Sequence, residues 1–165
     1  VVESVSLCGR SECPTNKIEA RTRESMSIRL GLARRRNVTA IAAMSRGLIE
    51  HGLPEMWNER RISKCISNPD CVVLVARDRR RLAGFAVAEF WDDRIHINLF
   101  CVAPSYQRQG VGRSLLEWLE SSAKTAGTFL MHLEVRESNA GARDFYKKQG
   151  FVETCLLYTS DAADE

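Results

Sequence analysis

The sequence predicts an α/β protein with a mixed central sheet and helices on both faces of that sheet. Segments rich in β-branched and aromatic residues alternate along the chain with segments of helical periodicity. One predicted strand runs directly into a glycine-punctuated helix start, an arrangement suited to binding an anion. The 165 residues favour one domain and are enough to bury a substantial core.

Composition excludes several classes of protein. The chain has no run of about 18 apolar residues and no visible secretory signal, so we expect no membrane association and a cytoplasmic location. A formal net charge of +3 is too small to indicate nucleic-acid binding. Six scattered cysteines form no C-x-x-C pair and no histidine lies at ligand spacing from them, so we expect reduced thiols and no metal site. We expect a monomer or weak dimer.

Three regions are expected. Residues 1–26 are polar with little periodicity and predict a loose leader that need not be ordered. Residues 27–154 predict the folded domain. We interpret residues 155–165, CLLYTSDAADE, as the read-through of a sequencing adapter; the alternative is a native acidic tail.

Hydrophobic periodicity places the elements of the domain. Apolar and polar residues alternate in the strands, whereas apolar residues recur every three to four positions in the helices. Gly52 with Pro54, Gly127 and Gly150 each follow a predicted helix and end it. The predicted strands are 27–36, 71–76, 82–90, 94–102, 129–136 and one starting at 151; the predicted helices are 38–51, 55–67, 110–126 and 139–148.

The strand 94–102 alternates regularly, so its residues should divide between the two sheet faces. One face should carry Ile95, Ile97, Leu99 and Cys101, and the other His96, Asn98, Phe100 and Val102.

The segment after this strand predicts a pyrophosphate-binding loop. Gly110 and Gly112 let an anion approach the main chain, and the first turn of the following helix offers unpaired N–H groups. Arg108 and Arg113 can neutralise phosphate charge. Leu115 replaces the third glycine of a dinucleotide fingerprint, and the P-loop Gly-Lys-Ser/Thr is absent. A glycine-rich turn with exposed arginines is the alternative.

Two motifs carry a family resemblance. The loop reads Q-x-x-G-x-G from Gln107, and residues 133–151 read LEVRESNAGARDFYKKQGF. Together they closely resemble the GNAT (Gcn5-related N-acetyltransferase) family, and most of all its RimI-like N-terminal protein acetyltransferases. The resemblance implies a sheet splayed between its fourth and fifth strands. Because the family continues past Phe151 with a strand pair, it also implies a domain truncated at the C-terminus.

The resemblance further implies that acetyl-CoA is the co-substrate, with no metal. Its arm would pair with the main chain of the fourth strand, and its diphosphate would bind the loop. The implied cofactor-binding residues are Phe100, Cys101, Val102, Gln107, Arg108, Gln109, Gly110, Val111, Gly112, Arg113 and Asn139. By analogy, the acceptor would contact His51, Leu53 and Trp57, although Trp57 is equally well explained as a core residue.

Acetyl transfer to an amine needs a base for the amine and a donor for the departing thiolate. Glu134 lies in an apolar strand, where burial would make its carboxylate a stronger base. Tyr146 carries a phenol with an ordinary pKa near ~10, which keeps its proton at neutral pH. The family has a carboxylate base and a tyrosine acid at these motif positions. Taken alone, Glu134 could instead form an ion pair and Tyr146 could be core.

The sequence thus predicts an acetyl-CoA-dependent N-acetyltransferase that acts by direct transfer in a ternary complex. A peptide or protein α-amine is the favoured acceptor, because its pKa near ~8 demands less of a base than lysine at ~10.4. The alternatives are a lysine or small-molecule amine acetyltransferase, or a non-catalytic acyl-CoA-binding module.

Overall fold

The computed structural model describes residues 2–10, 27–52, 56–128 and 130–159. Within these ranges a seven-stranded sheet has the order β2-β3-β4-β5-β6-β1-β7. Its strands are β1 (Val2–Arg10), β2 (Ile28–Leu32), β3 (Cys71–Asp78), β4 (Arg81–Phe90), β5 (Ile95–Val102), β6 (Leu130–Arg136) and β7 (Val152–Thr159). The α-helices are α1 (Val38–Leu48), α2 (Glu59–Ser67), α3 (Val111–Thr125) and α4 (Ala140–Lys148).

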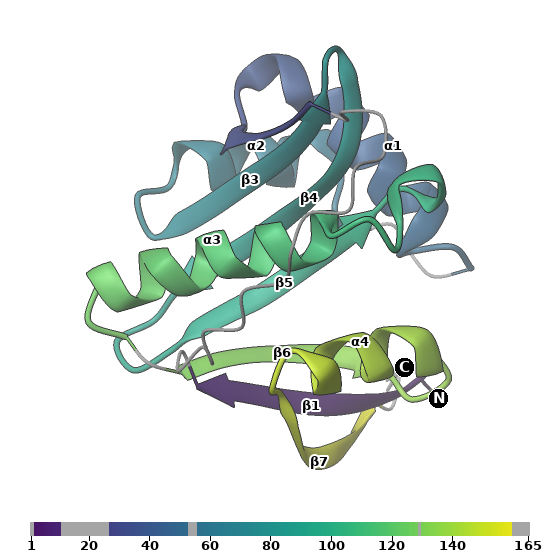
Figure 1. Ribbon diagram of the computed structural model, residues 1–165, viewed down its shortest axis with the longest axis vertical. Helices are drawn as coiled ribbons and strands as arrows, with labels where there is room; N and C mark the ends of the chain where they lie inside the picture. Colours follow the sequence, from purple (N-terminus) through teal and green to yellow (C-terminus); the bar gives the residue numbers. More distant parts are fainter. Residues whose placement is uncertain (1, 11–26, 53–55, 129, 160–165) are drawn as a thin grey trace, which may run out of the picture.

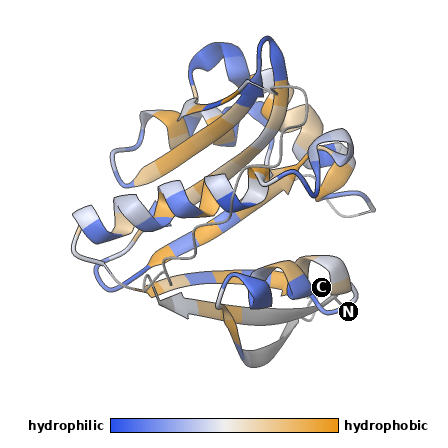
Figure 2. Ribbon diagram, viewed as in Figure 1, coloured by the Kyte–Doolittle hydropathy of each residue, from blue (hydrophilic) through white to orange (hydrophobic). Residues whose placement is uncertain are grey.

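Helices cover both faces of the sheet, as predicted. Helix α3 crosses one face, and α1 and α2 lie on the other (Figure 1). The predicted four-residue spacing of α3 buries Val111, Leu115 and Leu119 against the sheet, and polar residues occupy its outer side (Figure 2). On the opposite face a second cluster joins Ile41 of α1 and Ile62 of α2 to the central strands.

Strands β5 and β6 are parallel and separate part-way along their length. They pair only from Ile95 with Met131 to Ile97 with Leu133. Beyond that point β5 continues to Val102 paired with β4 alone among the described strands. This confirms the predicted splay between the fourth and fifth strands of the domain, and it leaves one edge of β5 facing the gap.

The predicted alternation along β5 is wrong at one position. Asn98 is an extra residue in the ladder, because Val87 pairs with Leu99 whereas the next residue, Ala88, pairs with Ile97. Such a bulge reverses the facing of the side chains that follow it. Ile95 and Ile97 therefore pack in the α3 core with Phe100 and Val102, while Leu99 and Cys101 join the α1–α2 core.

The leader expectation is wrong for residues 2–10. They form β1, which pairs antiparallel with both β6 and β7; residues 11–26 lie outside the described residues. Of the expected tail, residues 155–159 belong to β7, and residues 160–165 lie outside the described residues. Polar composition misled the prediction, because the ladder that orders β1 forms with strands distant in sequence.

Helix α2 also starts later than predicted, at Glu59. The side chain of Asn58 accepts a hydrogen bond from the Arg61 N–H at 3.0 Å and so caps the helix there. Among the described residues, no helix is long and apolar enough to cross a bilayer.

Candidate active site

The predicted phosphate loop leads into the N-terminus of α3. Gly110 is the N-cap residue at φ 84°, a left-handed conformation that favours glycine, and space is open where its Cβ would lie. A Cβ on Gly112 would lie only 3.1 Å from the Phe145 ring. Glycine at both positions therefore keeps the first turn of α3 in shape and leaves its N–H groups approachable, as a diphosphate requires.

The polar side chains of the loop fix its position on β5. The Gln107 amide donates to the Val102 carbonyl at 3.0 Å, and the Gln109 amide donates to the Ser105 carbonyl at 2.9 Å. Arg108 is exposed at the mouth of the loop. Arg113 is paired with Glu117 at 2.8 Å, so only part of its charge is available to a phosphate.

The gap between β5 and β6 begins at the bulge. Asn98 Nδ2 is buried and has no hydrogen-bond partner, alone among the side-chain atoms of the described residues. A buried donor without a partner is unfavourable, and an acceptor atom supplied by a ligand would relieve it. The unpaired edge of β5 offers N–H and C=O groups to an extended molecule, and the loop offers N–H groups to an anion.

Aromatic rings line one wall of the site. Tyr146 of α4 packs edge-on against Phe100 of β5 at 5.8 Å between ring centroids, and against Phe145 at 5.1 Å. Phe100 and Phe145 are also the rings nearest Gly112. Through these contacts α4 packs against the first turn of α3 and against the edge of β5.

Burial raises the pKa values of two groups near this aromatic wall, the Tyr146 phenol and the Cys101 thiol. Tyr146 is only 5% exposed, and burial, together with the nearby Cys101, raises the pKa of its phenol above the ordinary value. Burial also raises the pKa of the Cys101 thiol to about 11. Both groups are therefore neutral at physiological pH, which argues against Cys101 as a nucleophile.

Glu134 follows Leu133, the last residue of β6 that pairs with β5, so it stands where the strands separate. Its side chain is exposed, not enclosed by apolar neighbours as the sequence suggested. Beside it His132 Nδ1 lies 2.9 Å from His96 Nδ1. Burial lowers the pKa of both imidazoles, although the Glu134 charge opposes this shift.

These two histidines belong to a row of titratable residues that crosses five strands. Consecutive members are register partners on neighbouring strands, so their side chains share a sheet face. The row comprises Cys71, Glu89, His96, His132 and Cys8. Sequence analysis missed it because its members are linked only through strand register.

Near the helices α1 and α2, Glu50 holds Met56 and Trp57 in place. It is 7% exposed, and its carboxylate accepts hydrogen bonds from the main-chain N–H groups of Met56 at 2.8 Å and Trp57 at 3.0 Å. Arg136 of β6 donates to the Ile49 carbonyl at 2.8 Å. A carboxylate just after a helix looks solvated in the sequence, so these roles were not predicted.

The remaining predicted site residues have different environments. Trp57 is 7% exposed and belongs to the α1–α2 core, with the Arg61 guanidinium 4.0 Å from its ring centroid. His51 is exposed at the end of α1, and Leu53 lies outside the described residues. Asn139 caps α4 by accepting from the Ala142 N–H at 3.1 Å.

Known proteins resemble this chain in sequence. It is 40% identical to the [ribosomal protein bS18]-alanine N-acetyltransferase of Escherichia coli K12 over 76 residues, which are 46% of this chain and 51% of that protein. It is 36% identical over 88 residues to a streptothricin acetyltransferase of Streptomyces lavendulae, covering 50% and 47% of the two chains. The chain thus spans about half the length of these curated relatives.

Solved structures share the fold. That of the Escherichia coli ribosomal-protein-S18-alanine N-acetyltransferase is 27% identical with a TM-score of 0.66, over 78% of this chain and 79% of that one. That of PaiA N-acetyltransferase from Thermoplasma acidophilum, in complex with coenzyme A, is 21% identical with a TM-score of 0.70, over 84% and 96%. The acetyltransferase (GNAT) family profile matches residues 38–151. The chain therefore belongs to the GNAT family of acetyltransferases.

Proposed function

We propose that this protein transfers the acetyl group of acetyl-CoA to a primary amine, most readily the α-amine of a peptide or protein. One observation carries the proposal: β5 and β6 separate beyond Ile97 and Leu133, which leaves an edge of β5 unpaired just before the loop into α3 and puts Glu134 next to the point of separation.

Acetyl-CoA would supply the thioester. The first-turn amides of α3 would hold its diphosphate, and Arg108 would add charge. The unpaired edge of β5 at Phe100–Val102 would pair with the pantetheine amides as an added strand would, and Asn98 would gain a partner. One β5 amide would polarise the thioester carbonyl.

Glu134 would accept the proton of the incoming amine, directly or through a water. Its exposure in the free protein leaves it open to the acceptor, and the bound substrates would then exclude solvent around it. Burial lowers the pKa of the His132 imidazole, two residues before Glu134 on β6, so this ring is neutral at physiological pH.

Tyr146 would stabilise the departing thiolate. Its raised pKa makes complete proton transfer to a thiolate unfavourable, so its main contribution would be a hydrogen bond donated to the sulfur. Because Cys101 is buried and neutral, the transfer would run directly from thioester to amine, with both substrates bound.

The acceptor class is tested by coenzyme A release with a matched panel. It contains one peptide with a free α-amine, the same peptide blocked at its N-terminus but carrying a lysine, and a small polyamine. We expect the highest kcat/KM with the free α-amine. A tenfold preference for lysine or polyamine would reassign the acceptor. Calorimetric binding of acetyl-CoA without release of coenzyme A from any acceptor would indicate a binding module.

A further inference from the structure

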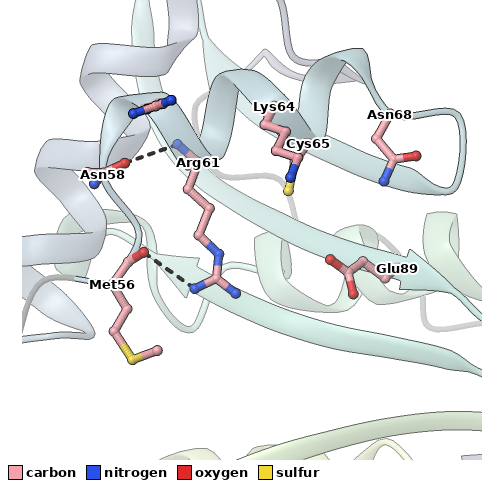
Figure 3. A pocket seen from close by; sticks show the side chains of 8 residues that line it. Met56, Asn58, Arg61, Lys64, Cys65, Asn68 and Glu89 are labelled. Carbon is pink, nitrogen blue, oxygen red and sulfur yellow. Dashed lines mark hydrogen bonds between the residues drawn. The ribbon is translucent and has the colours of Figure 1, made fainter.

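Two cysteines and a glutamate meet on the opposite side of β4 from the splay. Cys65 is in the last turns of α2, Cys71 begins β3, and Glu89 lies near the end of β4. Their ligand atoms, two sulfurs and a carboxylate oxygen, all lie within 4.8 Å of one another. Figure 3 shows Cys65 and Glu89 lining one pocket.

The fold brings these three residues together although they form no known metal-binding sequence motif. The turn at Asn68, Pro69 and Asp70 folds α2 back on β3, and the Cys71 N–H donates to the Asn68 carbonyl at 3.1 Å. Cys71 and Glu89 are register partners, so their side chains share a face. The five-residue spacer between the cysteines does not match the C-x-x-C pattern sought in the sequence.

The chemistry of the cluster suits a metal ion better than a reactive thiol. Cys65 and Cys71 are 7% and 8% exposed. Buried thiols are poorly placed to react with molecules in solvent, whereas two sulfurs and a carboxylate oxygen are ligands that a divalent cation of the zinc type prefers.

We propose that Cys65, Cys71 and Glu89 bind a divalent cation of the zinc type, with a pocket water as fourth ligand. In tetrahedral coordination, with about 2.3 Å to sulfur and about 2.1 Å to oxygen, the ligand atoms lie about 3.5–3.8 Å apart. This spacing is compatible with three ligand atoms that all lie within 4.8 Å of one another. Thiolate ligands select Zn²⁺ over Mg²⁺ or Ca²⁺. Three cationic residues, Arg60, Arg61 and Lys64, line the same pocket as Cys65 and Glu89.

The bound ion would link α2 to β3 and β4 and so stabilise the acceptor side of the domain. This role is independent of acetyl transfer, because none of the three ligands belongs to the proposed catalytic or coenzyme-binding residues.

The test uses the whole chain, reduced with a phosphine, stripped with a chelator and titrated with ZnCl₂ or CoCl₂. We expect one equivalent of zinc by mass spectrometry of metals, a thiolate-to-cobalt charge-transfer band, and a Tm raised by several degrees with saturating zinc. Cys65→Ser, Cys71→Ser and Glu89→Gln should each weaken zinc binding at least tenfold. Cys8→Ser is the matched control and should bind zinc like the unmodified chain.

The cobalt spectrum of the unmodified chain keeps the test decisive if a variant fails to fold, since absence of the thiolate band would by itself overturn the proposal. So would equal zinc affinity in Cys65→Ser and the unmodified chain. Isolation of the chain from a glutathione-buffered solution with a Cys65–Cys71 disulfide, detected as the loss of two hydrogens in the intact mass, would replace the metal site by a redox pair.

Discussion

The two sides of the splayed sheet are built in different ways. The proposed coenzyme side is made of main chain from one continuous segment, the end of β5 and the loop into α3, with glycines at positions 110 and 112. The proposed acceptor side is held together by side chains from distant segments, such as Glu50 after α1 and Arg136 of β6. The first kind of site would bind a feature common to every coenzyme A thioester, whereas the second could change its specificity one side chain at a time.

This contrast predicts that substitutions on the two sides separate kinetically. Those at the coenzyme side should change the affinity for acetyl-CoA, while those at the catalytic residues should change the rate of transfer from a bound thioester.

Glu134→Gln should have the largest effect. Removing the base should lower kcat/KM for the amine by about 10²–10⁴-fold, with the Kd for acetyl-CoA unchanged. Initial rates of coenzyme A release and calorimetry measure the two quantities. Glu137→Gln, which makes the same charge change just after β6, is the control and should keep its activity. Full turnover in Glu134→Gln would remove Glu134 from the mechanism.

Tyr146→Phe should come next. Losing a hydrogen bond to a charged sulfur costs about 1.5–3 kcal/mol, so kcat should fall by about 10–100-fold. The fold should persist, because the ring contacts with Phe100 and Phe145 remain. Tyr106→Phe, which removes the hydrogen bond from Tyr106 to Asp78, is the matched control. An unchanged kcat in Tyr146→Phe would make Tyr146 a core residue only.

The same contrast explains what the sequence could predict. The glycine at the start of α3, the buried face of α3 and the Asn139 cap follow from local patterns, and the structure contains all three. The bulge at Asn98 and strand β1 depend on pairing with strands far along the chain, which local periodicity does not contain.

At the site, the same division holds. Trp57 could be read equally as core or as acceptor contact, and it is buried. Glu50 and the His96–His132 pair have no local signature, because a glutamate after a helix and a histidine in a strand are both common on solvated surfaces.

Gly110→Ala should have a moderate effect confined to the coenzyme side. Its left-handed φ costs an alanine about 1–2 kcal/mol, and the new Cβ would occupy the space over the first turn of α3 that a diphosphate needs. We expect the Kd for acetyl-CoA to rise about tenfold by calorimetry. Gly127→Ala is a close control, since Gly127 has φ 78° and open space at the other end of α3. Equal loss of coenzyme affinity in both variants would attribute the effect to strain alone.

The smallest expected effect is on the pH dependence of stability. It tests whether protonation of His132 destabilises the region beside Glu134, where β5 and β6 separate. Burial lowers the pKa of His132, against the pull of Glu134 and with the help of Arg94. Below the ordinary value of about 6.5 the unfolded chain therefore binds more protons than the folded one. This contribution to stability is complete above about pH 6.5 and is lost as the pH falls through the folded-state pKa.

Because the ring is partly solvated, the resulting fall in Tm should be only about 2 °C. His132→Gln should remove that part of the fall in thermal scans from pH 8 to pH 5, whereas exposed His51→Gln should not. If His132→Gln followed the same pH profile as the unmodified chain, the acid sensitivity would have to arise elsewhere, and the junction would be electrostatically uncoupled from Glu134.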